Sequence, residues 1–224
     1  MREILTLLSG IAWTVVYIAC IVRGFRQRTY CMPAAALALN FSWECVYATH
    51  GLTGPASLQT VVDVVWAVAD AVIVVTFLRF GRAELPGALS RPRFAVWVVV
   101  LMAFGFAAQL LVVQQFGWHA GSRYSAFVMN VTMSLLFLAF HAARGGARGQ
   151  SVLIAVSKGV GTLAATGVFG VLEHSAFVLG LGIACAVLDA LYVAVLIADR
   201  TEPHPRPRGA RPAVAPRPTG RSAA

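Results

Sequence analysis

Long apolar runs separated by short polar connections fill residues 1–199. A helix rises about 1.5 Å per residue, so about 20 apolar residues cross a hydrocarbon layer of about 30 Å. The predicted fold class is therefore all-α, a polytopic membrane protein built as a bundle of seven transmembrane helices. These helices are expected at residues 4–22, 33–49, 58–80, 94–116, 124–143, 151–172 and 176–198.

Basic residues gather in every second connection. Arginines cluster after the first, third, fifth and seventh runs, whereas the other connections hold few. Because cytoplasmic loops carry the excess of Lys and Arg, we expect the N-terminus outside and the C-terminus in the cytoplasm. The Ala-, Arg- and Gly-rich composition favours a bacterial source, and hence the bacterial cytoplasmic membrane.

The chain changes character after Asp199, since six of its ten prolines fall in residues 200–224 without apolar periodicity. Such a segment cannot bury enough apolar surface to fold. We therefore expect a seven-helix transmembrane domain at residues 1–199 and a disordered Pro/Arg-rich cytoplasmic tail at residues 200–224.

Composition excludes a soluble globule. Only 12% of the residues are charged and 58% are hydrophobic, whereas soluble domains carry about 25% charged residues. The net charge of +9 lies in connections and the tail, so no nucleic-acid partner is expected. The four cysteines lack CxxC spacing, and no metal site is expected.

Acidic residues inside the apolar runs are the informative positions, because an ionisable group near the bilayer centre costs at least about 2.5–3.5 kcal/mol. Asn40, Glu44 and Tyr47 follow i, i+4, i+7 spacing and share one helical face, with Trp43 beside them. The amide and phenol can hydrogen-bond the carboxyl, and burial favours its neutral form.

Two other runs repeat this combination of acids and aromatic rings. Asp63, Trp66 and Asp70 follow i, i+3, i+7 spacing, and Asp189 is followed by Tyr192 at i+3. We expect these groups to face one cavity that opens outward, together with two further polar residues of the outer membrane half, Gln109 and Asn130.

Structural roles remain open for some of these residues. Asp63 lies near a helix start, where a carboxylate often interacts only with the helix dipole. Gln109 and Asn130 are equally well explained as contacts between helices. Lys158 is expected to reach the cytoplasmic surface or to pair with an acid.

The chemistry suggested is acid-initiated. Nucleophile elbows, phosphate loops, HExxH and the aspartate-rich motifs of soluble terpene cyclases do not occur. A desolvated carboxylic acid is a strong proton donor toward an apolar substrate. Aromatic faces stabilise carbocations. Together these groups suit the cyclisation of a polyene chain.

The motifs Asn40-x-x-Trp43-Glu44-x-x-Tyr47, Trp66-x-x-x-Asp70 and Asp189-x-x-Tyr192 resemble those of the integral-membrane terpene cyclases of fungal meroterpenoid and indole-diterpene pathways and their bacterial relatives. The resemblance covers the membrane region and not the tail.

The resemblance implies a catalytic acidic pair, Glu44 and Asp189, with no metal or cofactor. It also implies a prenyl chain on an indole or other aromatic acceptor, protonated at a terminal olefin or epoxide. A farnesyl chain and a prenyltransferase partner of the same pathway are expected. The lipid bilayer is the other expected partner. The candidate substrate-binding residues are Asn40, Trp43, Tyr47, Asp63, Trp66, Asp70, Gln109, Asn130 and Tyr192.

Two other functions fit seven helices with interior acids: a proton-coupled transporter or ligand sensor, and a structural subunit. Transporters often show related halves and broken helices, and the sequence shows neither. A structural subunit leaves the interior acids unexplained. Which acid donates the proton stays open at this point.

Overall fold

Every regular element in the described part of the chain is a helix. The computed structural model describes residues 1–55, 57–85 and 89–201, and within these residues there is no β-strand. The all-α fold class is thus confirmed, and the predicted tail lies outside the described residues except for Arg200 and Thr201, which end the last helix. The six α-helices are α1 (Arg2–Gln27), α2 (Ala34–Leu52), α3 (Leu58–Phe80), α4 (Arg91–Arg144), α5 (Val152–Thr166) and α6 (Ala176–Thr201).

Within the described residues, five helical segments are long and apolar enough to cross a membrane. Large apolar side chains such as Ile11, Val99 and Leu191 are exposed on their outer faces, which is unfavourable in water and suits lipid. The chain is therefore an integral membrane protein. The five segments are Arg2–Gln27, Leu58–Ala83, Arg91–Arg144, Val152–Leu172 and Ala176–Thr201.

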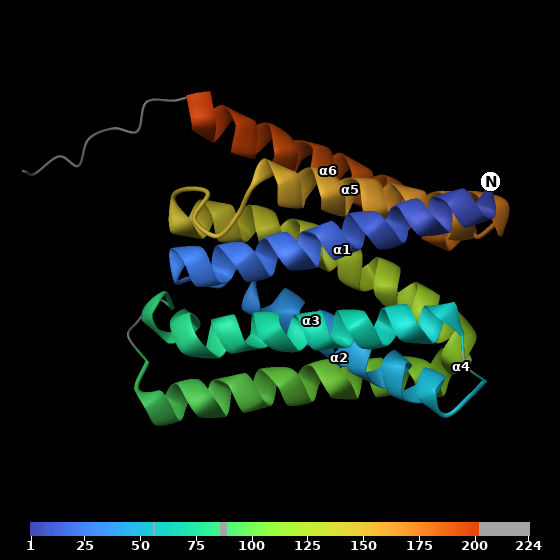
Figure 1. Cartoon of the computed structure of the whole chain (residues 1–224), viewed down its shortest axis with the longest axis horizontal. Coiled ribbons are helices and arrows are strands. Elements are labelled where there is room, and N and C mark those ends of the chain that lie inside the picture. Colours follow the sequence, from blue (N-terminus) through green and yellow to red (C-terminus); the bar gives the residue numbers. More distant parts are fainter. Residues whose placement is uncertain (56, 86–88, 202–224) are drawn as a thin grey trace, which may run out of the picture.

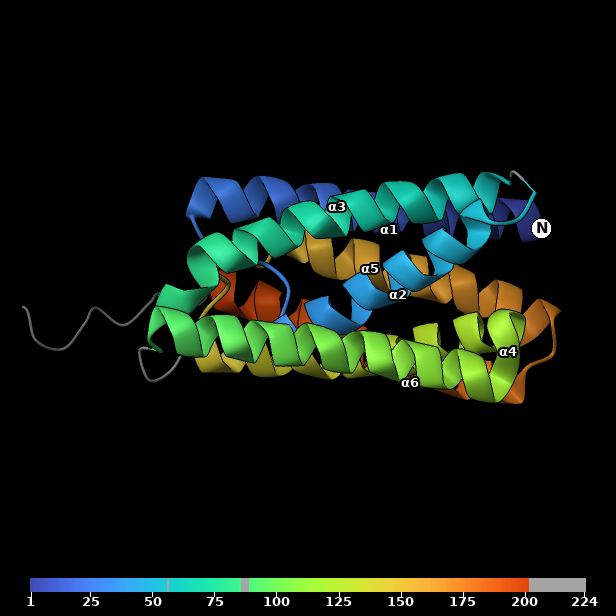
Figure 2. The same ribbon diagram turned by 90° about the horizontal axis from the view of Figure 1, so that it is seen from below.

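The longest helix, α4, is bent back on itself at one residue. It has 54 residues, with non-helical backbone angles at Gly117 (φ 73°, ψ 171°). Figures 1 and 2 show its first arm, residues 91–116, running to one end of the bundle and its second arm, residues 118–144, returning. The predicted connection at 117–123 is wrong, because all of it except Gly117 is helical.

Capping side chains explain where two helices begin. Ser57 Oγ accepts a hydrogen bond from Thr60 N (3.1 Å) at the start of α3, and Ser151 Oγ accepts one from Ile154 N (3.2 Å) at the start of α5. Each satisfies a backbone donor that lacks a partner inside its helix. The predicted boundaries 58–80 agree with α3, whereas the predicted run 151–172 comprises α5 and a π-helical turn, η2 (Gly167–Leu172).

Each helix packs against two or three neighbours. α2 packs against α3 and α4, while α1 packs against α3 and α5, and α6 covers α4 and α5. Side chains from α1, α3, α4 and α6 share one core cluster, which includes Tyr17, Phe77, Phe137 and Tyr192. At Gly105 a Cβ would lie 2.6 Å from the Ala38 carbonyl oxygen, so glycine permits close approach of α4 to α2.

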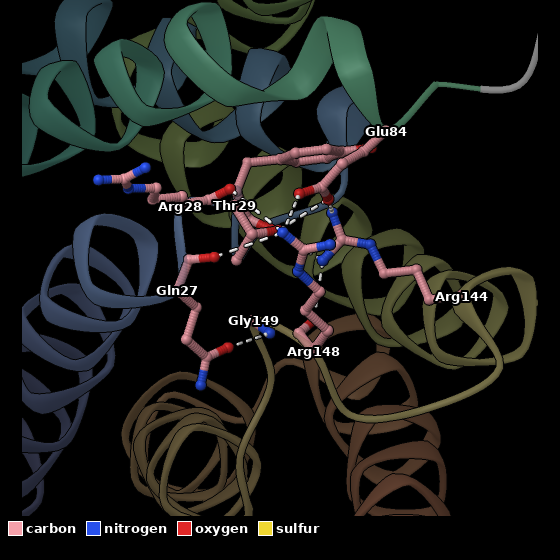
Figure 3. A network of polar contacts seen from close by, with 8 residues as sticks. Gln27, Arg28, Thr29, Glu84, Arg144, Arg148 and Gly149 are labelled. Atoms are coloured by element: carbon pink, nitrogen blue, oxygen red, sulfur yellow. Dashed lines mark hydrogen bonds and ion pairs between the residues drawn. The ribbon is translucent and has the colours of Figure 1, made fainter. Parts of the chain in front are cut away.

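The connection between α1 and α2 is buried, and α2 begins inside the bundle instead of at its end (Figure 2). Polar contacts fix this connection at the same end as the α3–α4 and α4–α5 connections (Figure 3). Glu84, which follows the 3-10 turn η1 (Gly81–Ala83), accepts a hydrogen bond from Thr29 Oγ1 (2.7 Å) and pairs with Arg144 and Arg148. We call Thr29, Tyr30, Glu84, Arg144 and Arg148 the Glu84 cluster.

Arg144 is the centre of the Glu84 cluster. Its guanidinium donates to the Tyr30 carbonyl oxygen (3.1 Å) and lies 4.4 Å from the centre of the Tyr30 ring. Burial raises the pKa of the Tyr30 phenol, and the nearby guanidinium opposes that shift. By donating to the Tyr30 carbonyl oxygen, Arg144 gives a hydrogen-bond partner to a backbone group of the α1–α2 connection that would otherwise be costly to bury.

Candidate active site

A buried hydrogen-bond network joins α1, α2 and α3 at Glu44. The Tyr17 hydroxyl donates to Glu44 Oε1 (2.9 Å) and accepts a hydrogen bond from Asn40 Nδ2 (2.8 Å). The same amide nitrogen donates to Asp70 Oδ2 (2.6 Å). Asn40 and Glu44 share one face of α2, as their spacing predicts, but Tyr17 connects them. We call Tyr17, Asn40, Glu44 and Asp70 the Glu44 network.

The Glu44 network contains two carboxyl groups and no Lys, Arg or His side chain. Glu44 is 2% exposed and Asp70 is 0% exposed. Among the described residues, no Lys, Arg or His forms an ion pair with either of them. Two buried carboxylates without a cation would carry a large desolvation cost. The arrangement therefore suits at least one protonated carboxyl that can act as an acid.

Aromatic rings lie next to the Glu44 network and farther along α2. The Trp66 ring lies 5.8 Å from the ring of Tyr17, and its Nε1 donates to Thr14 Oγ1 (3.1 Å). On α2, Trp43 and Tyr47 are 4.8 Å apart. Trp43 Nε1 donates to the Ser122 carbonyl oxygen (3.1 Å) in the second arm of α4. Ring faces near a proton donor can stabilise a cation that forms beside them.

Asp189 belongs to a second buried network, formed by α4, α5 and α6. Lys158 Nζ donates to Asp189 Oδ1 (2.8 Å) and Oδ2 (3.0 Å) and to Ser134 Oγ (2.6 Å). The Ser134 hydroxyl is also 2.8 Å from Asp189 Oδ1. The prediction that Lys158 either reaches the surface or pairs with an acid is resolved in favour of pairing. We call Ser134, Lys158 and Asp189 the Asp189 network.

The two networks are separate in the described part of the chain, where no hydrogen bond or ion pair joins Glu44 to Asp189. Tyr17 and Tyr192, one from each neighbourhood, belong to the same core cluster. A chamber shared by both acids stays a prediction.

Unpartnered buried oxygen atoms concentrate on the predicted residues. Within the described residues, seven buried side-chain atoms lack a hydrogen-bond partner, and six belong to residues that the sequence analysis selected. A buried polar atom without a partner is costly and needs an explanation, such as a catalytic or ligand-binding role. The six are Glu44 Oε2, Tyr47 Oη, Asp70 Oδ1, Gln109 Oε1, Asn130 Oδ1 and Tyr192 Oη.

A cavity of about 540 Å³ lies between the two arms of α4. Gln109, which is 3% exposed, lines it, and its side-chain amide makes no hydrogen bond to another described residue. Tyr124 packs edge-to-face on Phe116 (5.7 Å) and Phe177 (5.3 Å), and all three rings line the cavity. Neither Glu44 nor Asp189 does.

The remaining predicted residues make local contacts. Asp63 accepts a hydrogen bond from Gln59 Nε2 (2.7 Å) one turn earlier in α3. Asn130 Nδ2 donates to Thr162 Oγ1 (3.0 Å) and so joins α4 to α5. The Asn130 contact agrees with the interhelical role that the sequence left open. Asp63 lies beyond the first turn of α3, which holds no acidic residue, so its contact is to a side chain of its own helix and not to the helix dipole.

Sequence reasoning missed Tyr17, and it counted Ser134 among the interior polar residues without assigning it to the site. Tyr17 follows Trp13 at i+4, which is a signal of one aromatic face, but no acid lies within that run to draw attention to it. Ser134 is a small polar residue whose significance depends on its neighbours in space. Within the described residues, no group of three or more His, Cys, Asp or Glu side chains is arranged to hold a metal ion.

Comparisons with known proteins point in one direction. The model of the Pyr4-like transmembrane terpene cyclases matches residues 1–200. The terpene cyclase dpmpB of Macrophomina phaseolina is 30% identical over 158 residues, which are 70% of this chain and 65% of that protein. No solved structure matches the chain.

Two further relatives carry the same description. The terpene cyclase macJ of Penicillium terrestre is 30% identical over 71% of this chain and 63% of its own length. The terpene cyclase pyr4 of Aspergillus fumigatus is 26% identical over 88% of this chain and 86% of its own length. The chain thus spans less than two thirds of the first two relatives. All three come from fungi, so the comparisons do not support the bacterial source that composition favoured.

Proposed function

The chain belongs to the Pyr4-like transmembrane terpene cyclases, and from this premise we propose that it cyclises a prenyl chain attached to an indole or other aromatic acceptor, in a reaction started by a buried carboxylic acid. A farnesyl chain is the proposed substrate, and a prenyltransferase of the same pathway would supply it. The Glu44 network is the observation that carries the proposal.

Proton donation is assigned to Glu44. Its Oε1 accepts the Tyr17 hydroxyl, while its Oε2 is buried and has no partner among the described residues. A neutral carboxyl at this position has an O–H with no hydrogen-bond acceptor among the described side chains, so its proton is available for transfer to a substrate. Transfer of this proton to the less substituted carbon of the terminal double bond breaks the π bond and leaves a tertiary carbocation on the chain. Transfer to the oxygen of an epoxide leaves the same kind of cation as the adjacent C–O bond breaks and the oxygen becomes a hydroxyl.

Neighbouring aromatic rings then stabilise the carbocation. Tyr17 contacts the carboxyl and the Trp66 ring packs on the Tyr17 ring, while Trp43 and Tyr47 flank Glu44 along α2. Cation–π attraction is worth about 2 kcal/mol or more when desolvated, and the apolar bundle excludes the water that would trap the cation. Ring closure therefore competes well with hydration.

The cavity between the arms of α4 is proposed as the place for the aromatic head of the substrate. Its volume, about 540 Å³, falls within the range of about 300–1,000 Å³ that holds small organic ligands. Its lining is mostly apolar, and the amide of Gln109 offers one donor and one acceptor group. Leu39 lines the cavity and Asn40, the next residue of α2, belongs to the Glu44 network.

Seven membrane crossings are proposed, with the N-terminus outside. The two arms of α4 run in opposite directions along the bundle (Figure 1) and are counted as two crossings. The seventh crossing is α2, which is not among the five long apolar segments. The α1–α2, α3–α4 and α4–α5 connections and the end of α6 lie at one end, and they hold most of the basic residues. That end is proposed to face the cytoplasm. A bacterial cytoplasmic membrane is proposed on composition alone.

The test is conversion by membranes that contain the protein. Membranes incubated with a farnesylated indole are expected to yield an isomer of unchanged mass. Glu44→Gln keeps the size of the side chain and removes its acid, so we expect at least a hundredfold loss of conversion, the lower end of what general acids contribute. Mass spectrometry and chromatography measure it.

Asp63→Asn is the matched control, since Asp63 is an acid of α3 that lies outside the Glu44 network and makes its contact within its own helix. It should retain conversion within about threefold of the wild type. Full turnover by Glu44→Gln, at equal protein abundance, would remove Glu44 from the mechanism. Proton-coupled uptake into vesicles without any isomer would favour a transporter.

A further inference from the structure

Lys158 is completely buried within the proposed membrane region, and its contacts leave no hydrogen-bond donor free. It is 0% exposed, and its three ammonium protons are matched by three acceptors: Ser134 Oγ, Asp189 Oδ1 and Asp189 Oδ2. A lysine used in this way cannot bind a substrate group. Its influence on a reaction must therefore act through Asp189.

The two acids that the family resemblance pairs differ in their surroundings. Asp189 has a cation in contact with both of its oxygen atoms. Glu44 has a phenol on one oxygen and no described partner on the other. In a dry interior an acid without a cation retains its proton, whereas an acid in contact with an ammonium ion is stable as a carboxylate.

This inference rests on the proposed function. We propose that Lys158 is a positioning residue that holds Asp189 as a carboxylate, so that Glu44 starts the reaction and Asp189 acts on the cation that follows. The structure thereby gives the two acids opposite roles, a donor in the Glu44 network and an anion in the Asp189 network.

The protons balance over one turnover. The Glu44 O–H bond breaks, a C–H bond forms at the end of the chain, and the π electrons of successive double bonds form the rings. At the end, a C–H bond next to the last cation breaks, its electrons form a C=C bond, and its proton goes to Asp189 Oδ2. This atom accepts one hydrogen bond, from Lys158, so a lone pair remains. Water that enters on product release returns the proton to Glu44.

The first test compares Lys158→Met with Lys158→Arg in membranes. Without a cation, Asp189 takes up a proton and cannot serve as an anion. We expect Lys158→Met to lower kcat at least tenfold with KM within about twofold, and to raise the share of water-trapped or incompletely cyclised products. Lys158→Arg keeps the charge and should recover most of the wild-type product pattern.

A matched control separates this effect from loss of an ion pair in general. Arg144→Met removes one of the two cations that pair with Glu84 in the partly buried Glu84 cluster, so it should lower stability in detergent while leaving the product pattern unchanged. Wild-type kcat and product pattern in Lys158→Met, at equal abundance, would overturn the inference, as would the same product shift in Arg144→Met.

A charge-neutral double variant covers the case in which Lys158→Met does not fold. Lys158→Met with Asp189→Asn leaves no unpaired buried charge, and Glu44 is intact. We expect slow conversion with an altered product pattern, clearly above the level of Glu44→Gln. Conversion no higher than that of Glu44→Gln would show that Asp189 is needed to start the reaction. If the wild type itself gives no isomer, the proposed cyclase function is wrong. If the wild type gives the isomer and only the variants depart from expectation, the role assigned to Lys158 and Asp189 is wrong.

Discussion

At the scale of single residues, spacing located the polar groups of α2 but not their partners. The i, i+4 relation put Asn40 and Glu44 on one face, and both are in the Glu44 network. Their link, Tyr17, comes from α1, and sequence spacing within one helix carries no information about which helix packs beside it. The same limit applies to Lys158, for which pairing with an acid was one of two predicted outcomes and Asp189 was not identified as the partner.

Tyr17→Phe tests the Glu44 network at its central group. The change keeps the ring and removes the hydroxyl that accepts from Asn40 and donates to Glu44. Because Glu44 then loses its orienting hydrogen bond, we expect conversion to fall about tenfold or more, toward the range of general acid catalysis. Tyr30→Phe, outside both networks, is the control. Equal rates for the two variants would show that the phenol does not orient the acid.

At the scale of helices, apolar length predicted α3 to the residue and missed the geometry of α4. The stretch after Phe116 contains Gly, His, Ser and Arg, which resembles a polar connection. The structure keeps it helical because its side chains find partners: Trp118 stacks on His50 (3.8 Å), and Arg123 pairs with Glu173. Long-range contacts of this kind cannot be read from the local pattern.

Gly117→Ala tests the reversal of α4. The backbone angles of Gly117, φ 73° and ψ 171°, lie in a region that is essentially restricted to glycine, where another residue costs about 1–3 kcal/mol. We expect a lower midpoint of thermal unfolding in detergent. Gly10→Ala is the control, because a Cβ at Gly10 meets no atom within 4 Å. A midpoint for Gly117→Ala as high as that of Gly10→Ala would argue against a glycine-dependent reversal.

At the scale of the whole molecule, each end of the bundle has its own set of ion pairs. The Glu84 cluster joins three connections at one end (Figure 3). At the other end, Glu173 pairs with Arg2 (2.6 Å) and with Arg123. The clustering of basic residues in every second connection predicted which connections lie at the same end. This prediction needs only that successive spans run in opposite directions. The pairing within each end needed the structure.

Cysteine labelling in intact cells tests the orientation of the two ends. In a background without the native cysteines at 20, 31, 45 and 185, Ser90→Cys lies at the start of α4 near the Glu84 cluster, and Ser175→Cys lies between Glu173 and α6. Because basic connections remain cytoplasmic, a membrane-impermeant maleimide should label position 175 in intact cells and position 90 only after lysis. The reverse pattern would invert the molecule and place the Glu84 cluster outside. Between positions 90 and 175 the proposed topology has three crossings: the two arms of α4, which reverse at Gly117, and the helical run through α5. Labelling of both positions in intact cells would contradict this odd number of crossings.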